Sequence, residues 1–341
     1  MEKTALFILA CMVMCGTFAG CVPSAAIRAA IETADQLDSA IEEYTQAIRI
    51  GPADAESYKD RGGAYYDKGD LDRAIADYDK AIDLDPQLTE AYNNRGVAYR
   101  GKGDLNRAIA DYDQAIALSP QLAEVYSNRG VAYNEKGDHD RAIADFDQAI
   151  ALDSQCTEAY SNRGNAYGMK GDFDRAIADF DQAIALNPQL AEAYSNRGNA
   201  YWHKGVLDRA IADFDQAIDL DPQFTEAYNN RGVAYKDKGD LDRAIADFNR
   251  ALDLDPQHAG AYYNRALAYA LKGQYDQALS DLSKHIEIDA SSAIAYYLRG
   301  LLYAEVGEQE KAISDLERVL ELSLDPSTKQ DAEELLEELR Q

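Results

Sequence analysis

The sequence predicts an all-α protein built as an array of helical hairpins, and three observations lead to this fold class. The first is a fixed period. The phrase AYNNRGVAY at residues 91–99 returns as VYSNRGVAY at 125–133 and as AYNNRGVAY at 227–235. Its arginine recurs every 34 residues without insertion or deletion, at Arg61, Arg95, Arg129, Arg163, Arg197, Arg231, Arg265 and Arg299. Self-similarity at such a period is typical of a repeat array, so residues 55–326 are expected to form eight units of one array.

The second observation is that each unit contains two stretches with helical spacing of apolar residues. In the first unit, Tyr58, Gly62 and Tyr65 share one face of the first stretch, and Ala74 and Tyr78 share one face of the second. Each unit is therefore expected to be a pair of helices.

The third observation is a turn signal between the two stretches. In the tripeptide KGD, Gly69 can end the first helix and Asp70 can cap the second through its carboxylate. Pro86 then stops the second helix. A mid-helix glycine such as Gly62 costs about 1 kcal/mol relative to alanine, so its recurrence indicates a close approach between the paired helices.

Together, these features resemble the tetratricopeptide repeat (TPR) family, which has a 34-residue helix–turn–helix unit. The residues that carry the resemblance stand in the order Tyr58, Gly62, Tyr65, Ala74, Tyr78, Ala81, Pro86. Four departures are Ser154 for the closing proline, Ala266 for the glycine, and His285 and Val319 for the second alanine. The resemblance implies a TPR solenoid, a right-handed superhelix whose concave groove is lined mainly by the first helix of each pair.

Both ends of the array carry altered sequence. Residues 21–54 are interpreted as a degenerate N-terminal repeat, because Ala40, Tyr44, Ala47 and Pro52 stand 34 residues before their counterparts in the first unit. Arg28 takes the place of the glycine there. Residues 327–341 are expected to form a C-terminal capping helix, with Ala332, Leu335, Leu336 and Leu339 on one side and Glu333, Glu334, Glu337 and Glu338 on the other.

The recurring arginine stands sixteen residues before an aspartate in every unit, from Asp77 and Asp111 to Asp281 and Asp315. We therefore expect an ion pair between the two helices of each unit. The alternative is a row of arginines that binds an acidic ligand.

The N-terminus carries a segment without charge from Thr4 to Ile27. Residues 1–20 resemble a secretory signal peptide, and FAGC resembles a bacterial lipobox in which Cys21 is the lipidated residue. An uncleaved anchor helix is the alternative, since about 20 apolar residues can span a bilayer. Either interpretation exports the repeats, which would face the periplasm or the cell exterior as part of a membrane-anchored protein. Only Cys156 would then remain free, so no disulfide is expected within the mature chain.

Composition excludes several function classes. With 61 acidic and 34 basic residues the net charge is −27, which disfavours nucleic acid because phosphate binding needs a basic surface. The four histidines, His139, His203, His258 and His285, have no spacing of a metal site or catalytic triad. No cofactor, metal or catalytic residue is expected.

The preferred function is a non-catalytic adaptor, lipid-anchored in the bacterial cell envelope, that binds a partner protein or peptide in its groove. The alternatives are a passive spacer or self-assembling scaffold without a specific ligand, and an accessory subunit of an envelope enzyme. The oligomeric state stays open.

One groove column in the first six units is acidic: Glu56, Glu90, Glu124, Glu158, Glu192 and Glu226. It favours a basic partner, although glutamates in a first helical turn are also favoured by the helix dipole. The clamp by which some TPR proteins bind acidic C-terminal tails needs basic groove residues, and Lys59 alone fits it here. Binding to such tails is not expected.

The groove columns become apolar in the seventh and eighth units, which predicts a partner-binding site there. Its residues are Tyr263, Leu267, Leu271, Tyr297 and Leu301. A second candidate is Trp202, the only tryptophan, with its neighbour His203. The alternative is that these units repack, with the final helix or another copy of the chain covering the apolar residues.

Overall fold

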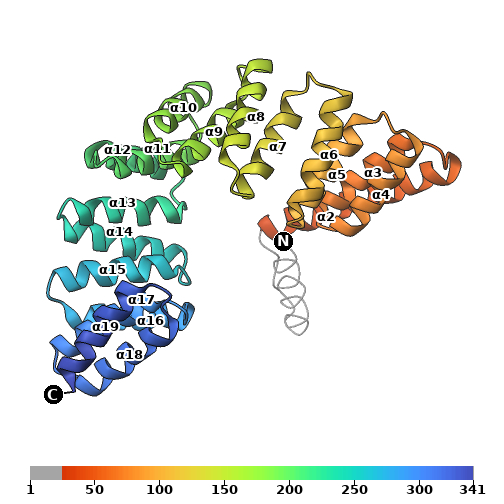
Figure 1. Ribbon diagram of the computed structural model, residues 1–341. Helices are drawn as coiled ribbons and strands as arrows, with labels where there is room; N and C mark the ends of the chain where they lie inside the picture. Colours follow the sequence, from red (N-terminus) through yellow and green to blue (C-terminus); the bar gives the residue numbers. More distant parts are fainter. Residues whose placement is uncertain (1–24, 341) are drawn as a thin grey trace. The chain divides into compact units, whose positions relative to one another are not determined.

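A computed structural model describes residues 25–340, and within them the chain is entirely α-helical, with eighteen helices and no strand (Figure 1). The first helices of the eight pairs are α3 (Ala55–Asp67), α5 (Thr89–Gly101), α7 (Ala123–Glu135), α9 (Thr157–Met169), α11 (Ala191–His203), α13 (Thr225–Asp237), α15 (Ala259–Leu271) and α17 (Ala293–Glu305). The second helices are α4 (Leu71–Leu84), α6 (Leu105–Leu118), α8 (His139–Leu152), α10 (Phe173–Leu186), α12 (Leu207–Leu220), α14 (Leu241–Leu254), α16 (Tyr275–Ile288) and α18 (Gln309–Leu322). The predicted fold class is confirmed.

The helices form two compact units, which divide between Lys170 and Gly171. The first contains α2–α9 and the second α10–α19. Within each, consecutive helices pack against one another along the chain. The hydrophobic core of each unit is accordingly a row of side-chain clusters between neighbouring helices.

The turn inside each pair follows from two residues. A glycine after the first helix adopts a positive φ, as at Gly137 with φ 82°, where a side chain would be strained. The next residue, Asp138, caps α8 by accepting a hydrogen bond from the backbone N–H of Arg141 at 3.2 Å. The fifth, seventh and eighth pairs differ, because their capping positions hold Val206, Gln274 and Glu308, and α12, α16 and α18 have no side-chain cap.

The mid-helix glycines allow the close approach that their recurrence predicts. A Cβ atom added at Gly96 would lie 2.7 Å from Cε1 of Tyr112, and one added at Gly130 would lie 2.7 Å from Cε1 of Phe146. No side chain fits between these helices. The aromatic rings of the second helices therefore pack directly onto the backbone of the first.

The N-terminal segment differs from the expected pair of helices. Within the described part of residues 21–54, α2 runs as one helix from Ala25 to Ile50. Asp35 stands where the first unit has Gly69, so the chain lacks the positive-φ glycine that would end a first helix there. Within the described residues, this segment is therefore one helix and not a pair.

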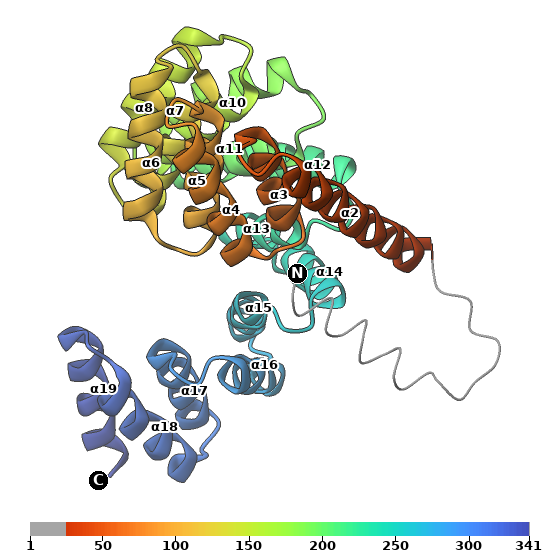
Figure 2. The same cartoon turned by 90° about the vertical axis from the view of Figure 1, so that its right-hand side faces the viewer.

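Helix α19 (Pro326–Leu339) closes the other end of the described chain, beside α17 and α18 (Figure 2). Ala332 and Leu336 are buried against α18 in one cluster with Leu316 and Val319. The four glutamates on its opposite side are exposed: Glu333, Glu334, Glu337 and Glu338. The helix thus covers the apolar end of the array with an acidic outer face.

Among residues 25–340, no helix is long and apolar enough to cross a membrane. The expected signal peptide and the lipidation site at Cys21 lie outside the described residues.

Candidate functional site

The first helices of neighbouring pairs lie close together within each unit. Contacts join α3 with α5, α5 with α7 and α7 with α9 in one unit, and α11 with α13 and α13 with α15 in the other, whereas no contact of similar extent joins second helices of neighbouring pairs in the described chain. Each unit therefore curves toward its first helices. We call the surface that these helices present the first-helix face.

The recurring arginines are engaged inside the fold. Arg95 donates from Nε and Nη2 to the carboxylate of Asp111, at 2.8 and 2.6 Å. Equivalent two-pronged contacts join Arg61 with Asp77, Arg129 with Asp145, Arg197 with Asp213, Arg231 with Asp247, Arg265 with Asp281 and Arg299 with Asp315. The expected ion pair between the helices is confirmed for these seven pairs.

Each guanidinium also bonds to the pair before it, a contact that sequence analysis missed. Arg95 Nη1 donates to Asp79 on α4 at 2.6 Å, and Arg163 Nη1 donates to Asp147 on α8 at 2.5 Å. At three positions the acceptor is an uncharged residue: Thr45, Asn249 and Ser283. The arginines thus connect neighbouring second helices, and the alternative of arginines free to bind a ligand is wrong for these residues.

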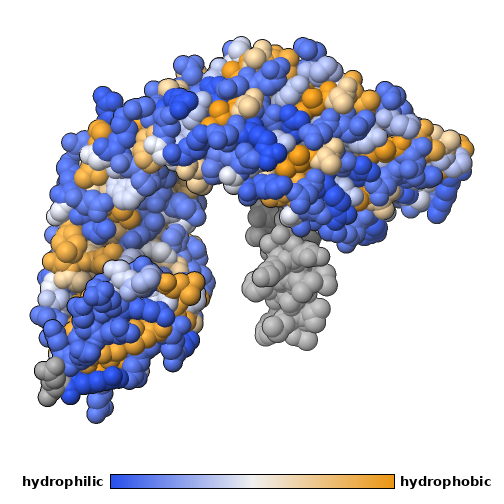
Figure 3. All heavy atoms as spheres, viewed as in Figure 1, coloured by the Kyte–Doolittle hydropathy of each residue, from blue (hydrophilic) through white to orange (hydrophobic). Residues whose placement is uncertain are grey.

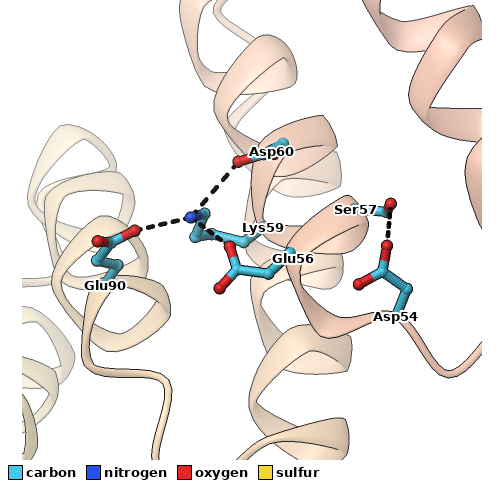
Figure 4. Close-up of polar contacts among 6 residues, drawn as sticks. All are labelled: Asp54, Glu56, Ser57, Lys59, Asp60 and Glu90. Atoms are coloured by element: carbon cyan, nitrogen blue, oxygen red, sulfur yellow. Dashed lines mark hydrogen bonds and ion pairs between the residues drawn. The ribbon is translucent and has the colours of Figure 1, made fainter.

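Lys59, the one residue that fits an acidic-tail clamp, is held by carboxylates of this chain (Figure 4). Its Nζ lies 2.6 Å from Glu56, 2.7 Å from Glu90 and 3.5 Å from Asp60. Burial lowers the pKa of Lys59, but the hydrogen bonds to Glu56 and Glu90 more than offset this, so its pKa lies above the ordinary value. An incoming carboxylate would have to displace these partners.

The column of glutamates lies where the helix dipole favours it, in the first turn of six first helices, and all six side chains are exposed. Part of the column serves the fold, since Glu56 and Glu90 bind Lys59, and Glu124 accepts from Asn93 at 3.2 Å. Glu192 and Glu226 are exposed on α11 and α13 and leave negative charge on this part of the first-helix face.

Trp202 and His203 lie together at the end of α11. The Trp202 indole is half-buried and donates from Nε1 to Asp237 at 2.8 Å on α13. His203 is exposed and stacks on Phe173, with ring centroids 4.7 Å apart and planes 7° apart. Trp202 also packs on the core cluster of α12–α15, so its contacts stabilise the array.

The five predicted apolar residues divide into two groups. Tyr263 packs against the core cluster of α15–α17, with its ring 5.5 Å from the ring of buried His285, and burial raises the pKa of its hydroxyl. Tyr297 packs against the cluster that α18 and α19 share. Burial, and then the charges of Asp331 and Glu334 on α19, raise its pKa. Both tyrosines therefore have structural contacts, and the final helix covers part of the predicted site.

The leucines are more accessible. Leu267 and Leu301 are half-buried, and Leu271 is 66% exposed at the end of α15. Sequence analysis missed Ile294, which is 50% exposed in the first turn of α17. The sequence did indicate this residue, because Gly260 and Ile294 stand in the seventh and eighth units where the earlier units have a glutamate. Figure 3 shows hydrophobic residues among hydrophilic ones over these last helices.

The described residues contain no group of three or more histidine, cysteine, aspartate or glutamate side chains that could hold a metal ion. Cys156 is half-buried before α9, and burial raises the pKa of its thiol, which disfavours the reactive thiolate.

Comparison with known proteins matches this architecture. Models described as TPR repeat match residues 62–103 and 98–137, and models described as tetratricopeptide repeat match residues 123–156, 161–223, 225–258, 259–292 and 293–326. No curated protein sequence matches the chain.

Two solved structures show the same fold at low identity. The crystal structure of the APC/C hetero-tetramer Cut9-Hcn1 aligns with a TM-score of 0.61 and 20% identity, over 88% of this chain and 58% of the other. The chain thus spans less than two thirds of that protein. A tetratricopeptide repeat protein from Parabacteroides merdae ATCC 43184 aligns with a TM-score of 0.60 and 22% identity, over 74% of this chain and 99% of the other. With its paired helices and these matches, the chain belongs to the tetratricopeptide repeat family, whose helical arrays serve as protein-interaction scaffolds.

Proposed function

We propose that this chain is a non-catalytic adaptor, held in the bacterial cell envelope by a lipid on Cys21, that binds an apolar segment of a partner protein on the first-helix face of α15 and α17. The observation that carries the proposal is the exposure of Leu271 and Ile294, at 66% and 50%, on a face that is otherwise mostly polar. Apolar side chains that gather on an exposed surface are typical of an interaction site.

The surroundings of these residues suggest which partner they fit. Leu267 and Leu301 are half-buried on the same two helices and add to their apolar residues. The preceding first helices α11 and α13 expose Glu192 and Glu226. A peptide with an apolar stretch followed by basic residues would match both features, with the apolar part supplying affinity and the charges favouring encounter.

The test uses the full-length protein in the envelope of an expressing bacterium. A photo-crosslinking amino acid at position 301 is used to identify a bound protein, and capture is then compared between wild type and the double variant Leu271→Glu, Ile294→Glu. Both positions are exposed, so thermal unfolding should be unchanged within about 0.5 kcal/mol. Capture of the same protein should fall at least about tenfold if the two residues anchor it.

Met169 provides the matched control. It stands 102 residues before Leu271, at the same place in the fourth pair, and is 72% exposed. Met169→Glu should leave capture unchanged. A single crosslinked protein that Met169→Glu leaves bound and the double variant loses supports the adaptor; no crosslinked protein, or equal loss in both, favours a passive spacer.

The lipid anchor is tested separately. Mass spectrometry of the N-terminal peptide from the purified mature protein should show a diacylglyceryl group on Cys21, and Cys21→Ser should release the protein from the membrane fraction. An unprocessed N-terminus in the membrane fraction would instead indicate an anchor helix.

A further inference from the structure

Helix α2 occupies the place of a second helix relative to α3. Arg61 Nη1 donates to Thr45 on α2 at 3.1 Å, as Arg95 Nη1 donates to Asp79 on α4. Lys68 likewise pairs with Asp38, as Lys102 pairs with Asp72. These contacts place α2 in register with the second helices of the array, 34 residues before α4.

Within the described residues, no helix covers the other face of α2 to complete the pair. In the first pair, α3 covers α4 so fully that Ala74, Tyr78 and Ala81 are 0%, 2% and 0% exposed. Their counterparts on α2, Ala40, Tyr44 and Ala47, are only half-buried. The chain does not supply the missing helix from its described part, because α2 continues back to Ala25 without a turn.

The same face carries a carboxylate that has no basic partner among the described residues. Glu43 stands where Asp77 binds Arg61 in the first pair, and it is exposed. Among the described residues its side-chain contact is the Ser39 hydroxyl at 3.5 Å. The open face of α2, formed by Ala40, Glu43, Tyr44 and Ala47, thus combines an apolar surface with an acceptor for an arginine.

The last helix of a second copy does not fit this face. Glu333 and Glu334 of α19 stand where the arginine and the glycine of a first helix belong. Glu333 would lie against Glu43, which has the same charge. Glu334 would place a long side chain at the position of Gly62 in the first pair, where even an added Cβ would lie 2.7 Å from Cε1 of Tyr78. Charge and size both exclude such a contact.

We infer that the open face of α2 binds a helix of another protein that carries an arginine next to a glycine or alanine, and so completes the repeat. This site is independent of the one on α15 and α17. The inferred contacts copy those of the intact pairs. The small residue of the partner helix packs on Tyr44, and its arginine bonds to Glu43, whose longer side chain replaces that of aspartate.

The probe is a peptide with the sequence of residues 89–102, TEAYNNRGVAYRGK, which forms the first helix of the second pair. Positions 90 and 94 lie on the side of the helix opposite Arg95 and Gly96 at 100° per residue. A lactam bridge from Glu90 to a lysine substituted for Asn94 keeps the peptide helical without touching the binding side. Its affinity for the full-length protein is measured by fluorescence anisotropy.

The expected result is a charge-reversal pattern. Glu43→Arg in the protein should weaken binding about tenfold or more, and Arg95→Glu in the peptide should do the same. The two reversed partners should restore the affinity to within about threefold. Gly96→Glu in the peptide should abolish binding. Glu42→Arg is the matched control, because Glu42 is exposed at the place of the exposed Ala76 and should leave the affinity unchanged.

Absence of peptide binding, or equal effects of Glu43→Arg and Glu42→Arg, would overturn the inference. Sedimentation velocity tests whether a second copy of the chain covers the open face of α2. A dimer that Ala47→Glu converts to a monomer, without a change in thermal unfolding, would show that another copy covers the face and would equally overturn it.

Discussion

Arg129 and Asp145 face each other across α7 and α8 through two hydrogen bonds, 2.8 Å from Nε and 2.6 Å from Nη2, and the third guanidinium nitrogen reaches Asp113 on α6 at 2.6 Å. The hydrogen bond to Asp145 is the main reason why the pKa of Arg129 lies above its ordinary value. The two carboxylates differ in environment: Asp145 has an 8% exposed side chain, and Asp113 is 55% exposed.

This difference predicts unequal contributions to stability. Asp145→Ala should lower the free energy of unfolding by about 2–3 kcal/mol, because it leaves a largely buried guanidinium without its main partner. Asp113→Ala should cost less than about 1 kcal/mol, because water screens an exposed pair. Urea unfolding followed by circular dichroism measures both. Equal losses for the two variants would contradict the assignment of Asp145 as the main partner.

The glycines of the first helices provide a second prediction. Gly130→Ala should destabilise by about 1–3 kcal/mol, because the added Cβ would lie 2.7 Å from the ring of Phe146. Gly168→Ala, on α9 with no atom within 4 Å of the added Cβ, should stabilise by about 0.5–1 kcal/mol. Thermal unfolding of the two variants should shift in opposite directions, and a shift in the same direction would show that close packing is not the reason for Gly130.

The missing cap in the fifth pair predicts a stabilising substitution. Val206→Asp should raise the free energy of unfolding by about 1 kcal/mol, because its carboxylate can accept from the backbone N–H of Arg209, as Asp138 accepts from that of Arg141. Val206→Asn is the control that caps without a charge.

The gain from Val206→Asp should depend on pH. The hydrogen bonds to Arg141 hold the pKa of the corresponding cap, Asp138, below its usual value. A carboxylate whose pKa is lower in the folded state contributes stability above its unfolded pKa of about 3.9. That stability is lost as the pH falls through the folded pKa. Urea unfolding at pH 7 and below pH 3 should therefore show that the stabilisation by Val206→Asp disappears at low pH. The stabilisation by Val206→Asn should change little between the two pH values.

The contacts of Tyr263 predict that its removal reduces stability, whatever it does to binding. Tyr263→Ala should cost about 2 kcal/mol, because the ring packs beside His285 against the core cluster of α15–α17. Leu271→Ala should change stability by less than about 0.5 kcal/mol, since the side chain is 66% exposed. Chemical unfolding of both variants measures the change in the free energy of unfolding. A Tyr263→Ala variant with unchanged stability would show that the tyrosine has no structural role.

The sequence predicted the features that repeat within one pair of helices. The period, the turn at Gly69 and Asp70, the close approach at Gly62 and the bond between Arg61 and Asp77 all depend on residues of one 34-residue unit. Such local contacts follow from helical spacing alone.

Contacts between pairs were harder to predict. The bond from Arg95 to Asp79 and the packing of Tyr297 with the cluster of α18 and α19 depend on how neighbouring pairs lie against each other. The spacing of Ala40, Tyr44 and Ala47 marked α2 correctly as a second helix, but it suggested a partner helix before it that the described chain lacks. A pattern on one helix defines the shape of its partner without showing which chain provides that partner.

The acidic outer face of α19 determines at which end further repeats can be added to the array. Because stacked repeats have nearly identical surfaces, an uncovered end of one molecule can bind the opposite end of another. Repeated contacts of this kind would produce fibres. At α19 the glutamates at 333, 334, 337 and 338 make that end unfit for the next layer, whereas α2 keeps the surface of an ordinary repeat. Engineering that lengthens the solenoid should therefore insert units before α19 or join them at α2, since units added beyond Leu339 would meet repelling charge.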